Sequence, residues 1–271
     1  MSRVILGDNP FFGVSHYSPE KSSNYIADAN RFSNASDVIK SAGKLGIELL
    51  MISSHEETAE LLATAGYGTP KSDFLPDICL LVPNVHDMNK SAAAGGVYAS
   101  LRALFKGTKL SDFIRPRRLL SSVLLGNNNF PEVTHVGLHN IATDLMIGLN
   151  ARWVLRIFCA VTRFCGFKPV LVTLNPDRLR EMKVLPDAIC CYYNLTGYNV
   201  CHATKGFLEE ETSRDARRTE LWAMGVLASG VVEYQDLEKD ETLRRFDRVV
   251  VASSRPQRVK EMFQIITSSS F

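Results

Sequence analysis

Residues 170–192 read VLVTLNPDRLREMKVLPDAICCY and contain one complete strand–helix–strand pattern. The runs Val170–Thr173 and Ala188–Tyr192 are almost continuously apolar, which is typical of parallel strands that are covered on both faces. Between them, Asn175-Pro176-Asp177 carries a helix-start signal, because proline is favoured in the first turn of a helix. This stretch therefore predicts two parallel strands joined by a crossover helix.

The same alternation continues in both directions along the chain. Eight apolar runs predict strands: Val4–Gly7, Ile47–Ser53, Ile78–Pro83, Thr134–His139, Val170–Thr173, Ala188–Tyr192, Leu221–Val226 and Arg248–Ser253. Helical spacing predicts helices at Asp37–Leu45 (with Ser36 as its cap), Glu56–Thr64, Met88–Phe105, Asn150–Phe164, Asp177–Met182 and Pro256–Ile266. Such alternation in 271 residues predicts an α/β fold, a single (β/α)8 TIM barrel spanning residues 1–271. An open doubly wound sheet is the alternative, but no GxGxxG follows the first strand.

The connection between the third and fourth strands is longer than the others. The excess is residues 106–131, which we interpret as an insertion or extended loop within the barrel. A solvated surface insertion is one interpretation of this segment. A lid or a partner-docking segment is the other, because long loops in compact domains are often functional.

Composition excludes several classes of protein. Hydrophobic residues make up 45% of the chain, and the formal net charge is +2, so the chain is neither disordered nor strongly basic. Six cysteines without a CxxC pattern predict reduced, buried thiols in a cytoplasmic protein. The first apolar run is too short for a signal peptide. We therefore expect a small-molecule substrate and neither nucleic acid nor a membrane as partner.

The most apolar region, residues 145–167, is interrupted by Arg152, Arg156 and Arg163. A membrane span needs about 20 mainly apolar residues. Trp153, Ile157, Val161 and Phe164 recur instead at helical spacing. This pattern predicts an amphipathic helix whose apolar face covers the core.

A (β/α)8 barrel places its functional site at the carboxyl ends of the strands. Polar residues at those positions give the candidate catalytic residues Asp8, His55, Glu56 and His139, and the candidate substrate-binding residues Asn9, Asn84, His86 and Asn175. His139 closes an apolar strand, and histidine is suited to proton transfer near neutral pH. His55, Glu56, His86 and His139 also allow a divalent-metal site, but no HxH or HExxH spacing supports one, so no metal is expected. Helix capping by polar loop residues is the competing explanation.

The ends of the last two strands predict a phosphate site. Ser229-Gly230 follows the seventh strand, and Ser253-Ser254 follows the eighth at the start of a helix that carries Arg258. Backbone N–H groups at a helix N-terminus attract anions, and an arginine can bind phosphate in a bidentate manner. Barrel enzymes often bind phosphate at these two loops.

The carboxyl-terminal part of the chain resembles the aldo-keto reductase superfamily. Residues 188–196, AICCYYNLT, are similar to its sixth-strand pattern ending in Tyr-Asn, and residues 221–230, LWAMGVLASG, are similar to its seventh. Residues 249–261, VVVASSRPQRVKE, are similar to the segment that holds the adenosine phosphate of NADPH in that family. The resemblance implies NADP(H) as cofactor, with Asn194, Ser253, Arg258 and Glu261 at binding positions. It also places His139 on the family's catalytic histidine.

The other three members of the family's catalytic tetrad are not matched. The second strand ends in MISSHE, residues 51–56, where the family has an Asp followed shortly by a Tyr. The third strand ends in LVPN, residues 81–84, where the family has a Lys. The sequence therefore predicts an oxidoreductase for a small carbonyl compound with an altered proton donor. A cofactor-independent lyase or isomerase acting on a phosphorylated metabolite, and a non-catalytic binding protein, are the alternatives.

Overall fold

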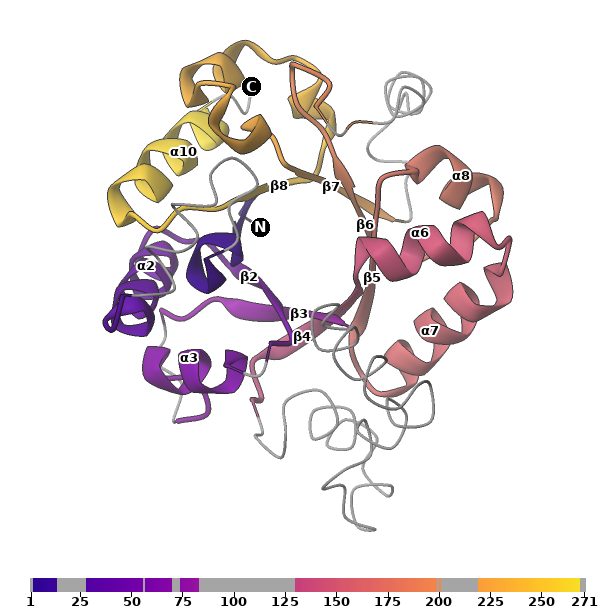
Figure 1. Cartoon of the computed structure of the whole chain (residues 1–271), viewed down its shortest axis with the longest axis horizontal. Helices are drawn as coiled ribbons and strands as arrows, with labels where there is room; N and C mark the ends of the chain where they lie inside the picture. Colours follow the sequence, from indigo (N-terminus) through magenta and orange to yellow (C-terminus); the bar gives the residue numbers. More distant parts are fainter. Residues whose placement is uncertain are drawn as a thin grey trace.

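Eight parallel strands close into a barrel (Figure 1), which confirms the predicted (β/α)8 fold. The computed structural model describes residues 2–13, 28–55, 57–69, 74–82, 130–198, 200 and 219–268. The strands are β1 Val4–Gly7, β2 Leu49–Ser53, β3 Asp77–Val82, β4 Val133–Leu138, β5 Lys168–Thr173, β6 Ala188–Tyr192, β7 Glu220–Met224 and β8 Arg248–Val251. Pairing of β1 with β8, in the register Leu6 with Val251, closes the barrel.

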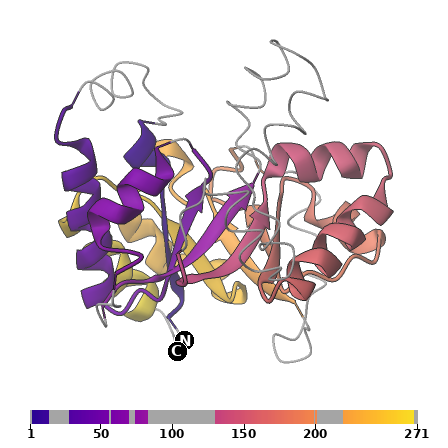
Figure 2. The ribbon, with the colours of Figure 1, turned by 90° about the horizontal axis from the view of Figure 1, so that it is seen from below.

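Helices surround the barrel (Figures 1 and 2). The α-helices are α2 Arg31–Lys44, α3 Thr58–Ala65, α6 Asn140–Gly148, α7 Arg152–Phe164, α8 Pro176–Glu181 and α10 Pro256–Ser268. Short 3-10 helices are η1 Asn9–Phe12, η3 Ala228–Gly230, η4 Tyr234–Lys239 and η5 Leu243–Arg245. The predicted start of α2 at Asp37 is wrong: Ser36 lies inside the helix, where its hydroxyl donates to the carbonyl of Thr64. The helix predicted at residues 88–105, and residues 106–129 of the predicted insertion, lie outside the described residues.

Alternating side chains divide the strands between two apolar regions. One side of each strand packs against the helices, and the other side fills the barrel interior. The interior is lined by Ile5, Leu49, Met51, Cys79, Leu81, Val170, Val172, Ala188, Cys190 and Trp222. The five described cysteines are buried free thiols, as predicted. The interior is therefore a packed core, and it leaves only the two ends of the barrel for polar chemistry.

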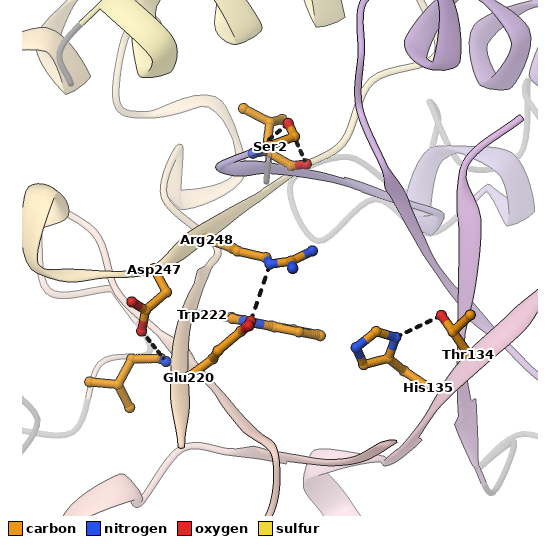
Figure 3. A network of polar contacts seen from close by, with 9 residues as sticks. Ser2, Thr134, His135, Glu220, Trp222, Asp247 and Arg248 are labelled. Atoms are coloured by element: carbon orange, nitrogen blue, oxygen red, sulfur yellow. Dashed lines mark hydrogen bonds and ion pairs between the residues drawn. The ribbon is translucent and has the colours of Figure 1, made fainter. Parts of the chain in front are cut away.

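A polar network closes the end where the strands begin (Figure 3). Trp222 is fully buried, and its Nε1 donates to Glu220 Oε2 at 2.8 Å. The same oxygen pairs with Arg248 Nε at 3.1 Å, and the Arg248 guanidinium lies 5.7 Å from the Trp222 ring centroid. On the other side, the His135 ring centroid lies 5.7 Å from that of Trp222. We call Glu220, Trp222, Arg248 and His135 the barrel plug.

Burial lowers the pKa of His135 to about 3, with the charges of Lys168 and Arg248 adding to the effect. His135 is thus neutral at physiological pH, and it accepts or donates one hydrogen bond at 2.8 Å with the Thr134 hydroxyl. The plug occupies the amino-terminal face, where barrel residues usually serve stability. The opposite end, where the strands finish, is the face that carries the ligand sites of such barrels.

The orientation of α7 differs from the prediction. Its buried residues are Leu155, Cys159 and Thr162. Trp153 and Phe164, predicted to cover the core, are 64% and 77% exposed. The larger apolar face of α7 therefore points away from the barrel.

Candidate functional site

The candidate site is the rim formed by the carboxyl ends of the strands. Neighbouring strand ends are held together by backbone hydrogen bonds that continue past the strands. Ser54 N donates to Leu81 O at 3.0 Å, and His139 N donates to Val82 O at 2.8 Å. Ser54 and His139, the first residues beyond β2 and β4, are thus each held by a carbonyl of β3.

Asp8 is the buried acid of this rim. It follows β1 directly, is 5% exposed, and accepts a hydrogen bond from Ser53 N on β2 at 2.6 Å through Oδ2. Burial raises the pKa of Asp8 to about 6, and the hydrogen bond from Ser53 only partly offsets this rise. A carboxyl group with such a pKa exchanges protons close to neutral pH, as a general acid or base requires.

His55 follows β2 in the part of the rim that contains Ser53, and its N–H donates to Ser53 O at 2.9 Å. Its ring contacts Phe12 of η1, with 4.2 Å between the ring centroids. Its backbone N–H donates to the Thr58 hydroxyl at 2.9 Å, and that hydroxyl donates to Ser53 O at 2.6 Å. The structure therefore brings Asp8 and His55 together around Ser53. Glu56 lies outside the described residues.

His139 occupies another part of the rim. It is the N-cap of α6 and accepts a hydrogen bond from Ile141 N at 3.4 Å through Nδ1. It is half-buried, and β3 separates its strand from the strand that carries Ser53. His139 thus follows β4 as predicted, with a capping role that accounts for one of its ring nitrogens.

Asp144 organises the rim between β4 and β5. Its carboxylate accepts hydrogen bonds from the Thr173 hydroxyl, from Leu174 N at 3.0 Å and from Asn175 Nδ2 at 3.3 Å. The side-chain amide of Asn175, a predicted substrate-binding residue, is therefore held by the Asp144 carboxylate. Asn9 is exposed at the start of η1, and the predicted residues Asn84 and His86 lie outside the described residues.

Tyr192 is a rim residue for which the sequence suggested no role. It follows Ala188 and Cys190 on the inward-facing side of β6, so alternation along the strand places it at the mouth of the barrel. A Cβ on Gly225 would lie 2.9 Å from Tyr192 Cδ1, which shows how closely the ring is packed. Burial raises the pKa of Tyr192, and the charges of Cys190, Asp144 and Tyr198 act in the same direction. Strand alternation was the available signal for this residue.

The loops after β7 and β8 form the candidate anion site. Arg255 and Arg258 are exposed around the first turn of α10, and no described side chain is paired with either. Ser253 Oγ accepts a hydrogen bond from Arg255 N at 3.1 Å, and Ser254 beside it is exposed. Two exposed guanidinium groups at the N-terminus of a 13-residue helix suit a phosphate group.

The other four predicted cofactor-binding residues are Asn194, Ser229, Gly230 and Glu261. Gly230, in η3, is exposed with φ of +95°, and the backbone of Ser229 precedes it. Glu261 accepts a hydrogen bond from Gln257 Nε2 at 3.1 Å. Asn194 is buried, and its amide bonds to the backbone N–H and carbonyl of Tyr198, the Thr196 hydroxyl and the carbonyl of Gly225. The phosphate end of NADP(H) therefore fits the residues present, whereas the Asn194 amide is already engaged by its own loop.

Within the described ranges, no group of three or more His, Cys, Asp or Glu side chains is placed to hold a metal ion. Of the four residues in the metal alternative, His55 and His139 are described. They follow different strands, β2 and β4, with β3 between them. The described residues give no support to a metal centre.

Solved aldo-keto reductases share this fold. A Pseudomonas aeruginosa protein named as an aldo-keto reductase aligns with a TM-score of 0.59 at 19% identity, over 99% of this chain and 90% of that chain. A glycerol dehydrogenase from Gluconobacter oxydans aligns with a TM-score of 0.52 at 12% identity, over 99% of this chain and 91% of that chain. No protein-family model matches the chain, and no curated protein is significantly similar to it in sequence. The chain is thus an aldo-keto-reductase-like TIM barrel in fold.

Proposed function

We propose that this barrel binds NADP(H) at its carboxyl-terminal rim and reduces a small carbonyl compound, with Asp8 as the proton donor. The observation that carries the proposal is the Asp8 carboxyl, buried at the rim of an aldo-keto-reductase-like barrel with a pKa of about 6. The family's tyrosine is not matched after β2, so the reaction needs another acid. Asp8 is hydrogen-bonded to Ser53 at the end of that same strand.

Asp8 is suited to hold and release a proton. Its Oδ2 is occupied by the Ser53 N–H, so the proton of the neutral acid resides on Oδ1. A general acid is most effective when its pKa lies near the operating pH, and burial brings Asp8 into that range. The His55 ring lies against Phe12 of η1, in the same part of the rim.

The cofactor would be held chiefly through its phosphates. Arg255 and Arg258 supply positive charge, and the helix dipole of α10 adds to it. Ser254, exposed beside them, can donate a hydrogen bond to a phosphate oxygen. When bound, a reduced nicotinamide supplies the hydride for carbonyl reduction.

A second candidate rests on Asn194. The side-chain amide of Asn194 is fully engaged within its own loop. It therefore has no free group to bind the nicotinamide ring of NADP(H), although the family resemblance places Asn194 at a cofactor-binding position. This favours a cofactor-independent lyase or isomerase that binds a phosphorylated metabolite at the same arginines. Asp8 would then exchange a proton with the carbon or oxygen of that metabolite.

Titration with NADPH, followed by calorimetry and by NADPH fluorescence, separates the two candidates. The reductase requires submillimolar binding that Arg258→Ala weakens at least tenfold. Arg244→Ala is the matched control, because Arg244 is an exposed arginine of η5, shortly before the amino-terminal end of β8. Absence of NADPH binding to the wild type removes the reductase. Binding of inorganic phosphate that still depends on Arg258 would then favour the second candidate.

A further inference from the structure

The helical hairpin α6–α7 carries a row of exposed apolar side chains. Its members are Ile141, Leu145, Leu149, Trp153, Ile157, Val161 and Phe164, each 49–77% exposed. They recur every four residues, with a last step of three. Scattered surface apolar residues are normal, but a contiguous apolar patch usually marks an interaction site. We call these seven residues the hairpin stripe.

On α7 the stripe lies opposite the face that packs on the barrel. Leu155 and Cys159 are buried, and they are two residues beyond Trp153 and Ile157 along the helix. With 3.6 residues per turn, positions two apart point roughly 200° from each other. The α7 part of the stripe runs from residue 153 to residue 164, a distance of about 16 Å along the helix axis. It therefore faces outward at the edge of the ring of helices (Figure 1).

The charges beside the stripe are basic. Arg152, Arg156 and Arg163 all lie on one border of the α7 stripe and are exposed. Arg156 donates to the neutral carbonyl of Lys183 at 3.1 Å and so keeps its full charge, whereas Arg163 pairs with Asp187 at 3.1 Å.

The hairpin has a single acidic residue, and its charge is directed elsewhere. Asp144, on α6, is engaged by the loop that follows β5. Arg163 is paired with Asp187, but no described carboxylate is paired with Arg152 or Arg156. An apolar stripe bordered by these two cations complements a surface that is apolar inside and negatively charged outside.

This charge pattern disfavours two other occupants. A second copy of the chain, docked antiparallel through the same face about a two-fold axis, would bring like arginine borders close to each other. The chain's own segment 83–129 is the other candidate occupant. It carries seven Lys or Arg and two Asp, so its net charge is positive and would be repelled by these arginines. An anionic lipid surface has neither disadvantage.

We propose that the hairpin stripe docks on the surface of an anionic phospholipid bilayer. Helices with basic borders and Trp, Phe and Leu on the apolar face lie in the plane of the interface, with the apolar side chains at the boundary of the headgroups and acyl chains. Trp153 is a residue type that favours this depth. No helix within the described ranges is long and apolar enough to span a bilayer. The sequence expectation of no membrane partner rested on net charge and run length, and neither quantity reports which face of a helix is exposed.

The chain contains its own fluorescent reporter for this docking. It has two tryptophans: Trp153 is 64% exposed and Trp222 is fully buried. Titration with phosphatidylcholine vesicles containing phosphatidylglycerol is expected to shift the emission to the blue and to protect Trp153 from acrylamide. Pure phosphatidylcholine vesicles should give little change, and about 0.5 M salt should reverse much of the effect. Trp153→Phe should abolish the shift while leaving vesicle cosedimentation in place.

Phe164→Ser is expected to weaken partitioning about tenfold or more, because it removes the most exposed apolar side chain of the stripe. Phe74→Ser is the matched control: Phe74 is 59% exposed and lies before β3, outside the hairpin. Neither substitution removes a buried side chain, so both variants should fold.

Several results would overturn the proposal. Equal binding to neutral and anionic vesicles, or to neither, contradicts an anionic lipid surface. Protection of Trp153 from acrylamide in the lipid-free monomer means that the chain itself covers the stripe. A dimer in sedimentation experiments that Phe164→Ser dissociates means that a second copy does.

Discussion

The carboxylate of Asp8 accepts a 2.6 Å hydrogen bond from the backbone N–H of Ser53, which joins the end of β1 to the end of β2 through one buried acid. Ser53 belongs to the segment 51–56, in which the aspartate of the family resemblance is not matched. A carboxyl group nevertheless lies in this part of the rim, and it comes from the end of the neighbouring strand β1. Its role can be tested through its protonation.

Asp8→Asn should change the pH dependence of stability. Burial raises the folded-state pKa of Asp8 from 3.8 to about 6, so its stabilising contribution is full below pH 3.8 and is lost as pH rises through about 6. An asparagine keeps an acceptor for Ser53 and cannot ionise. The free energy of unfolding of the variant, relative to wild type, should therefore rise by about 2 kcal/mol between about pH 4 and pH 7. Urea denaturation across this range measures it, and a pH-independent difference would contradict the raised pKa.

The barrel plug should make a measurable contribution to stability. Glu220→Ala removes one partner of Arg248 and leaves Trp222 Nε1 without this acceptor. Because the Arg248 side chain is 7% exposed but that of Glu220 is 39% exposed, the loss should cost about 1–2 kcal/mol. Glu181→Ala, which breaks the exposed pair with Arg178, should cost less than about 0.5 kcal/mol. Equal midpoints in urea for the two variants would refute this role of the plug.

The sequence predicted the barrel because each strand is an apolar run that stands out against helical spacing. It could not predict which way α7 faces. Both Leu155 and Trp153 belong to apolar arcs of that helix, and the larger one was expected inside, whereas the structure buries the arc with Leu155 and Cys159. The spacing of apolar residues shows how they are distributed around a helix. It does not show which apolar face packs against the barrel.

The site was predictable only in part. Strand ends placed Asp8, His55 and His139 at the rim, because topology alone decides which residues follow a strand. The burial of Asp8 and the full engagement of the Asn194 amide depend on loop conformation, which no spacing rule specifies. Tyr192 could have been found by extending the inward alternation of β6 by one step.

Two helical glycines should respond oppositely to alanine. A Cβ on Gly43 of α2 would meet the Phe74 backbone oxygen at 1.5 Å, so Gly43→Ala should cost about 3 kcal/mol or prevent folding. A Cβ added to Gly148 of α6 would have nothing within 4 Å, so Gly148→Ala should stabilise by about 0.5–1 kcal/mol. Thermal unfolding followed by circular dichroism compares them, and a destabilised Gly148→Ala would refute the assignment of open space at that position.

Substitutions of His139 can separate capping from chemistry. His139→Ala removes the acceptor for Ile141 N and should cost about 1 kcal/mol of stability. His139→Asn restores a good N-cap, so it should recover that stability without an imidazole. If His139 takes part in the reaction, turnover of any identified substrate falls in both variants. Full turnover in His139→Asn would limit the residue to capping.

The barrel plug makes the two ends of the same strands independent of each other. Glu220 and Arg248 open β7 and β8, and the candidate anion site follows the other ends of those strands, a few residues away. The polar contacts of the plug stabilise the amino-terminal end of the barrel. Residues at the carboxyl-terminal rim can therefore be substituted without disturbing those contacts. This division gives the barrel evolvability: side chains at the rim can be exchanged for new chemistry while the plug keeps the scaffold foldable.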